Sequence, residues 1–145
     1  MKKTGYNIIQ FSLSKELQHG MMVSILAGEL ARKAGLSEEQ CHELSIAGLL
    51  HDIGKLEMAK YVYQKGQKPL TIEEIKYVRL HPTLGYAITS QNHYSDCIIK
   101  SILYHHENYN GSGFPSNLKE DEIPIGARIL RICDVFAALI SDRPY

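Results

Sequence analysis

The chain has 145 residues, 44% of them hydrophobic and 22% charged, which are ordinary values for one globular domain. Sixteen Lys and Arg balance sixteen Asp and Glu, so binding to a long nucleic acid through bulk charge is not expected. No apolar run approaches the roughly 20 residues that span a bilayer, and the N-terminal segment has no continuous apolar stretch. A cytoplasmic location without membrane contact is therefore expected. The three cysteines, Cys41, Cys97 and Cys133, are far apart and are expected to fill core space.

Apolar residues recur at intervals of three and four, which predicts helices through most of the chain. A first helix is expected over 14–33, and Gly35 follows its end. Its apolar stripe is predicted to contain Leu17, Met21, Ile25 and Gly28. His19 is expected on the side of this helix that faces the interior.

Ser37 and Gln40 form a capping-box pattern, which predicts the start of a second helix that continues towards His51. Its apolar positions are Cys41, Leu44, Ala47 and Gly48. Gly54 is expected to end this helix. The segment 57–69 is ambiguous, because its pattern fits either a loop or a short β-hairpin.

Thr71 and Glu74 repeat the capping signature and predict a third helix that ends near Leu80, because Pro82 disfavours helical backbone at the residue before it. Pro82 can begin a fourth, short helix. A fifth helix is expected after a cap at Ser95 or Asp96, and its apolar band contains Ile98, Ile99, Ile102 and Leu103.

The segment 108–117 reads NYNGSGFPSN, a density of Gly, Asn and Pro that predicts a sharp turn. Helix is expected to resume after Pro124, with Ile125, Ile129, Ile132, Cys133 and Phe136 on its buried side. The prediction is an all-α bundle of about six helices, forming a single domain over 1–145.

His51 and Asp52 lie at the end of an apolar helix, in the string AGLLHDIGK. A carboxylate that follows Leu49 and Leu50 is expected near the core, where an unpaired ion is costly. A cation must therefore meet Asp52. An ion pair with Lys55, or an exposed helix end, is the simplest interpretation of this pair alone.

His105, His106 and Glu107 also end an apolar helix and open into the glycine-rich segment. His81 lies at a break set by proline, and a hydrogen-bonded structural role is the simpler interpretation for this histidine taken alone. Asp134 is harder to explain in that way, because its apolar neighbours imply burial.

Divalent metal ions would explain these residues together, since imidazole and carboxylate ligands without cysteine suit Fe, Mn, Zn or Ni and argue against Mg or Ca. The candidate ligands are His19, His51, Asp52, His81, His105, His106 and Asp134. Seven candidates exceed the needs of one ion, so two ions are expected, with Asp52 as the carboxylate that bridges them.

A two-metal centre polarises a phosphoryl oxygen and supplies hydroxide near neutral pH, which makes phosphoester hydrolysis the expected chemistry. Lys55 could hold a substrate phosphate, and a solvated lysine is the alternative. Gly111 and Gly113 could let backbone amides approach an anion, or they could only shape a turn.

Four strings carry a resemblance to a known family: HDIGK at 51–55, LHPTLGYAI at 80–88, HHENYNGSGFP at 105–115 and PIGARILRICDVFAALISDRPY at 124–145. Together with the order of His19, His51, Asp52 and Asp134, they resemble the HD-GYP subgroup of the HD-domain metal-dependent phosphohydrolases. The resemblance implies a helical fold, a centre that often contains iron or manganese, and hydrolysis of cyclic di-GMP to linear pGpG and GMP.

The resemblance also implies which residues surround each ion. His19, His51, Asp52 and Asp134 would surround one metal, and Asp52, His81, His105 and His106 the other. Lys55 and Arg143 match positions that engage substrate phosphates. Zinc and nickel are the alternatives to iron and manganese.

Three positions depart from the family pattern. The signature Gly-Tyr-Pro is Gly113-Phe114-Pro115, a loop that could contact a signalling protein. Members with three metals carry a glutamate four residues before the first histidine, whereas this chain has Lys15 there and Glu16 one residue later, so two metals are expected. The chain stops at Tyr145, where relatives continue into further helices, so the C-terminal helices are expected to be missing.

The expected function is therefore a metal-dependent phosphodiesterase for cyclic di-GMP. Two alternatives stay open: an HD-type phosphohydrolase for another cyclic dinucleotide or nucleotide, and a catalytically weak module that binds a nucleotide or a partner. The oligomeric state is open as well.

Overall fold

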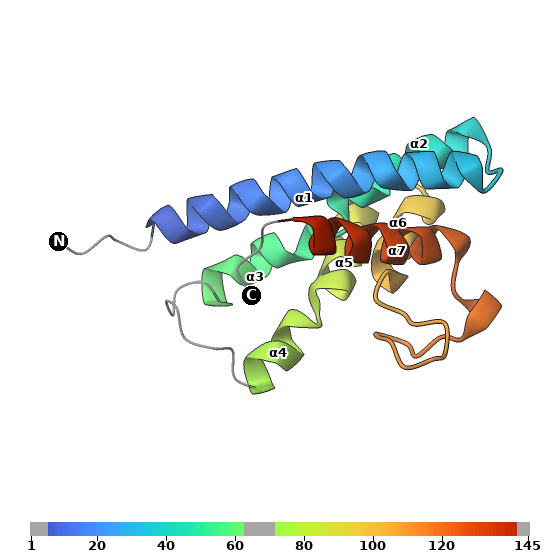
Figure 1. Cartoon of the computed structure of the whole chain (residues 1–145). Helices are drawn as coiled ribbons and strands as arrows, with labels where there is room; N and C mark the ends of the chain where they lie inside the picture. Colours follow the sequence, from blue (N-terminus) through green and yellow to red (C-terminus); the bar gives the residue numbers. More distant parts are fainter. Residues whose placement is uncertain (1–5, 63–71, 142–145) are drawn as a thin grey trace.

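The computed structural model describes residues 6–62 and 72–141, and in these residues the protein is helical, as expected (Figure 1). The helices are α1 (Tyr6–Lys33), α2 (Glu38–Leu50), α3 (Gly54–Val62), α4 (Ile72–Val78), α5 (His81–Gln91), α6 (Asp96–Tyr104), the 3₁₀ turn η2 (Glu120–Glu122) and α7 (Ile125–Ile140). An isolated β-bridge between Asn110 and Lys119 closes the loop between α6 and α7. None of the described helices has the length and apolar character that a membrane crossing requires.

The long helix α1 lies along α2 and α7, and α6 packs between α2, α5 and α7 (Figure 1). The core lies where these helices meet and consists of small and branched side chains. Its fully buried members include Val23, Ala27, Leu44, Ala47, Ile102 and Leu130. Cys41 and Cys133 are buried in this core and Cys97 is packed against it, and all three are free thiols, as expected.

The predicted apolar stripe of α1 is wrong for three of its four members. Leu17, Met21 and Ile25 are between 55% and 68% exposed, whereas Gly28, the fourth member, is buried together with Val23 and Ala27. Both faces of α1 carry apolar residues, and the face that packs is the one with small side chains. The close approach of α1 and α2 selects this face, because a Cβ atom at Gly48 of α2 would lie 2.9 Å from the backbone of Ser24.

The prediction for α7 is correct in part. Ile129 and Cys133 are buried, but Ile132 and Phe136 are at least half exposed and Ile125 nearly so. The helix has an apolar band wider than the surface available to cover it in the described chain, so only its central stripe reaches the core.

The predicted caps are confirmed where the structure describes them. The Ser37 side chain accepts from the amide of Gln40, whose side chain accepts in return from the Ser37 amide. Ser95 caps α6, and Pro82 lies in the first turn of α5. The helix predicted to end near Leu80 is α4.

Gly54 does not end the second helix as predicted, because α2 ends at Leu50 and Gly54 begins α3. Gly54 packs against the backbone of His81, where a side chain would collide with the carbonyl oxygen. This close contact brings the end of α2 next to the start of α5. The hairpin alternative is wrong for residues up to Val62, since α3 occupies them; the remainder of 57–69 and Thr71 lie outside the described residues.

Candidate metal centre

Three buried histidines enter the centre from helix termini in the same manner. His51 and His105 are the C-caps of α2 and α6, and His81 is the first residue of α5. Each ring bonds through Nδ1 to the carbonyl oxygen three residues earlier, at 2.7 Å for His51, 2.8 Å for His81 and 2.7 Å for His105. The carbonyl accepts the proton of Nδ1, so Nε2 of each ring points into the centre and presents a lone pair there whenever the ring is neutral.

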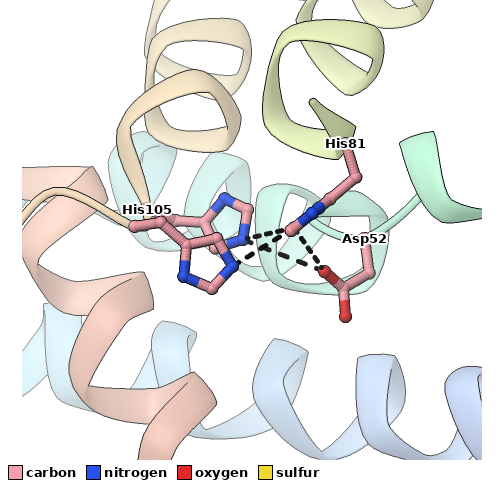
Figure 2. A group of neighbouring side chains, drawn as sticks. Asp52, His81 and His105 are labelled. Carbon is pink, nitrogen blue, oxygen red and sulfur yellow. Dashed lines mark hydrogen bonds and ion pairs between the residues drawn. The ribbon is translucent and has the colours of Figure 1, made fainter. Parts of the chain in front are cut away.

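Asp52 lies beside the rings of His81 and His105, and one of its oxygens faces both (Figure 2). Oδ1 is 3.2 Å from His81 Nε2 and 3.8 Å from His105 Nε2. Oδ2 is 3.3 Å from His51 Nε2 and 2.6 Å from the Lys55 ammonium. The ion pair between Asp52 and Lys55 therefore exists beside the histidine cluster, because one carboxylate can serve both.

His19 and Asp134 join the centre from α1 and α7. His19 Nε2 lies 2.8 Å from Asp134 Oδ1, and the same oxygen is 3.6 Å from His51 Nε2. The expectation that His19 faces the interior is confirmed, since it is 3% exposed. Asp134 is half-buried and paired, which accounts for a carboxylate inside an apolar helix.

The seven predicted ligands converge, and their donor atoms form three overlapping groups, each with its atoms within 4.8 Å of one another. The first group contains Asp52, His81, His105 and His106, the second His19, His51 and Asp52, and the third His51, His105 and Asp134. Asp52 belongs to the first two groups, which is the position that a bridging carboxylate would need.

Four buried atoms at this centre have no hydrogen-bond partner among the described residues: Glu16 Oε2, His19 Nδ1, His51 Nε2 and Asp52 Oδ1. Lone pairs of His81 and His105 face each other at 3.4 Å between their Nε2 atoms. Facing lone pairs and unpartnered buried polar atoms are costly unless a cation lies between them. The residues present therefore fit divalent ions with nitrogen and oxygen ligands.

The pKa shifts of the carboxylates and imidazoles agree with binding of divalent ions. Burial opposes charge at Asp52 and Asp134, yet His51 and Lys55 hold the pKa of Asp52 well below its usual range, and hydrogen bonds from His19 and His51 do the same for the pKa of Asp134. Although burial alone would lower it, the two carboxylates raise the pKa of His51 to about 10. Burial and the neighbouring rings lower the pKa of His105, so this ring is neutral.

Not all of the residues predicted to contact a substrate lie at the centre. Lys55 points into the centre between Asp52 and Glu16, whose Oε2 is 3.8 Å from the ammonium. The Gly111 amide donates to Asn108 at 2.8 Å, which gives this glycine a role in a turn. Arg143 lies outside the described residues. The contacts of these residues with a substrate stay predictions.

A side chain at Gly113 would collide with the backbone of Glu107 and Asn108, so this loop folds tightly onto the end of α6. Phe114 stacks on the His106 ring, with 4.8 Å between the centroids. The aromatic residue of the Gly113-Phe114-Pro115 signature therefore packs on the centre itself.

The sequence assigns no role at the centre to three groups that the structure places there or beside it. Glu16 lies three rather than four residues before His19, although both spacings share one helix face. Glu107 is 2% exposed and accepts from the amides of Ser116 and Leu118, so it organises the loop. Arg131 lies three residues before Asp134 and donates to His106, and that spacing was the available signal.

Comparison with known proteins gives consistent results. A family model described as "HD domain" matches residues 3–145. The cyclic di-GMP phosphodiesterase response regulator RpfG of Xanthomonas campestris is 42% identical over 125 residues, covering 85% of this chain and 33% of the relative. The 3'3'-cGAMP-specific phosphodiesterase 1 of Vibrio cholerae is 32% identical over 139 residues, covering 96% of this chain and 32% of the relative.

Among solved structures, Bd1817, described as an HDG"Y"P protein from Bdellovibrio bacteriovorus, superposes with a TM-score of 0.70 at 26% identity. The match covers 86% of this chain and 41% of that chain. This chain therefore spans about a third of the length of the two curated relatives.

Proposed function

The chain belongs to the HD domain family, as its resemblance to the HD-GYP subgroup predicts, and we propose that it is a metal-dependent phosphodiesterase that hydrolyses a cyclic dinucleotide. One observation supports this most strongly. Asp52 belongs to two groups of donor atoms, with Oδ1 3.2 Å from His81 Nε2 and Oδ2 3.3 Å from His51 Nε2, and these imidazoles are oriented by backbone carbonyls.

In this proposal Asp52 bridges two divalent ions, His19, His51 and Asp134 complete one set of ligands, and His81, His105 and His106 complete the other. Such a pair of ions would supply Lewis-acid activation of a phosphoryl group and of water. Lys55 keeps its charge, because the neighbouring carboxylates of Asp52 and Glu16 raise its pKa against the effect of burial. Its ammonium can therefore offset charge on a bound phosphate.

We propose cyclic di-GMP as the substrate, with linear pGpG and then GMP as products, and iron or manganese as the metal. The named activity of RpfG supports this choice. The activity named for the Vibrio cholerae relative makes cGAMP the second candidate. A cytoplasmic location and a signalling partner at the loop Gly113-Phe114-Pro115 stay predictions.

The test uses purified protein loaded with Mn²⁺ or Fe²⁺ and chromatographic detection of products from cyclic di-GMP, cGAMP and cyclic di-AMP. We expect cyclic di-GMP to be cleaved fastest, and Asp52→Asn to lower kcat by about 100-fold or more, because both ions lose a ligand. Asp96→Asn is the matched control, since Asp96 is exposed and pairs only with Lys100 among the described residues. Equal turnover by Asp52→Asn would contradict the assignment, and tight binding without turnover would favour a binding module.

A further inference from the structure

His106 differs from His51, His81 and His105 in what its ring nitrogens contact. Its Nδ1 faces Nη1 of Arg131 at 3.1 Å, instead of a backbone carbonyl. A guanidinium carries only donors, so Nδ1 of His106 must accept this hydrogen bond. The proton of the neutral ring is then on Nε2, the nitrogen that faces the centre.

The neighbouring contact agrees with this proton position. His106 Nε2 lies 3.2 Å from His81 Nε2, whose lone pair is free because His81 Nδ1 donates to the Val78 carbonyl. A proton on His106 Nε2 makes this contact a normal hydrogen bond. A proton on His106 Nδ1 would instead leave two lone pairs face to face and point an N–H at the guanidinium.

Arg131 is well placed to hold this arrangement. Its second terminal nitrogen donates to Asn108 Oδ1 at 3.0 Å, and Asn108 in turn donates to Ser112. The guanidinium is therefore fixed between α7 and the loop that follows α6. Phe114 stacks on the His106 ring and restricts its rotation.

We propose that Arg131 is a positioning residue that keeps His106 in the tautomer opposite to that of His81 and His105, so that His106 is a hydrogen-bond donor at the centre and binds a metal only when the contact with Arg131 is broken. An ion at this group would then be held first by Asp52, His81 and His105, and His106 would complete the set of ligands only after its contact with Arg131 breaks. This inference rests on the proposed metal centre, but its first test does not.

The first test is a long-range ¹H–¹⁵N correlation spectrum of the metal-free chain, which reports which ring nitrogen carries the proton. We expect Nδ1 to be protonated in His81 and His105, and Nε2 in His106. In Arg131→Met we expect the form of His106 with Nδ1 protonated to become more populated, because no donor then faces Nδ1. A His106 ring with Nδ1 protonated while Arg131 is present would overturn the proposal.

The second test is a titration with Zn²⁺ against a competing chelator. Arg131→Met is expected to tighten binding at the weaker position about tenfold, the lower end of the effect of residues that orient a metal ligand. Arg131→Lys keeps both the charge and a donor, and is expected to behave as the unmodified chain. Arg131→Leu also removes every donor to Nδ1 and is expected to match Arg131→Met, which provides a second variant should one fail to fold.

A double-mutant cycle with His106→Ala separates the tautomer from simple charge repulsion between Arg131 and the ion. The gain from Arg131→Met is expected to vanish without His106. A gain that persists in His106→Ala would overturn the proposal, because it would then come from charge alone. A chain that binds no metal in any variant would contradict the proposed function and the predicted gain, while the tautomers would still be decided by the spectrum.

Discussion

The histidines of the centre are placed by a local rule that acts one residue at a time. Because His51 and His105 are C-caps and His81 follows the end of α4, each has a carbonyl oxygen three residues earlier that no longer accepts a full helical bond. Nδ1 satisfies that carbonyl, and the opposite nitrogen is aimed inward. The backbone thus satisfies its own polar atoms and orients a ligand with one contact.

The raised pKa of His51 leads to a prediction on metal binding. The two neighbouring carboxylates raise this pKa to about 10, so the ring carries an extra proton at pH 8 in the metal-free chain. A metal ion must displace this proton, and at least about one proton per chain is expected to be released. Binding should therefore tighten by about tenfold per pH unit between pH 7 and 9. Calorimetry in buffers of different ionisation enthalpy measures the release.

The same shift has a defined sign for the metal-free protein. Because the pKa of His51 is raised in the folded chain, the ring stabilises the fold fully below its unfolded pKa of about 6.5, and this stabilisation is lost as the pH rises through about 10. The free energy of unfolding is thus expected to fall across this window. His42→Gln is the control, since His42 is exposed and distant from the centre. A metal titration without proton release would contradict the prediction.

The buried carboxylate of Glu107 leads to a prediction on stability. Its carboxylate is 2% exposed and accepts from Ser116 N at 2.6 Å and from Leu118 N at 3.1 Å. Glu107→Gln replaces one acceptor by an N–H group, which is expected to cost about 1–3 kcal/mol of stability. Faster hydrogen exchange at the two amides would localise the effect. Glu29→Gln, an exposed partner of Arg32, should stay within about 0.5 kcal/mol, and equal losses in both variants would contradict the account.

At the scale of elements, the crossing of α1 and α2 depends on glycine. A Cβ atom at Gly48 would lie 2.9 Å from the backbone of Ser24, whereas one at Gly28 would collide only with the Ser45 hydroxyl, which can rotate, and would lie at an ordinary 3.6 Å from the Cys41 carbonyl oxygen. Gly48 also supplies the carbonyl that orients His51. This crossing therefore connects helix packing to the geometry of the centre.

Gly48→Ala is expected to lower the free energy of unfolding by about 1–3 kcal/mol, because the helices must separate to admit a methyl group. Metal affinity should fall as well, since the carbonyl that holds His51 moves. Gly28→Ala is the matched control and should be neutral or slightly stabilising, because alanine favours helix. Chemical denaturation and metal titration of both variants give the comparison. Equal stability of the two would show that the close approach does not limit the packing.

Sequence patterns predicted the elements well where a local interaction decides them. The caps at Ser37 and Ser95 are examples, because each depends on residues within one turn. The stripe of α1 could not be found in this way. Apolar residues lie on both faces of the helix, and the distance between α1 and α2 selects the face, which is a property of the pair of helices.

In the centre, too, local patterns were predictable and contacts between distant segments were not. His51, Asp52, His105 and His106 were predicted because they end apolar helices, and Asp134 because its apolar neighbours imply burial. The family strings supplied the division of the ligands between two ions. The orientation of His106 could not be predicted, since it depends on Arg131, which lies 25 positions away in the sequence and reaches it only in the folded chain.

At the scale of the whole molecule, the centre joins segments from both ends of the described chain. His19 comes from α1, Asp52 follows α2, His81 begins α5, His105 ends α6 and Asp134 lies on α7 (Figure 1). In the metal-free chain these elements bring together carboxylates, imidazoles and unpartnered polar atoms. An ion that satisfies them binds the folded chain far better than the unfolded one, and therefore stabilises the fold as a unit.

A thermal prediction follows from this linkage. Metal at about 100 times its dissociation constant adds about 2.7 kcal/mol to the free energy of unfolding, which for a chain of this size raises Tm by roughly 5–10 °C. Removal of the ion with a chelator should reverse the shift. Asp52→Asn is expected to lose more than half of it, because the bridging carboxylate contributes to both positions, whereas Asp96→Asn should keep all of it. A shift of the same size in Asp52→Asn would mean that the ion binds elsewhere, and the case for a bridged pair at this centre would fail.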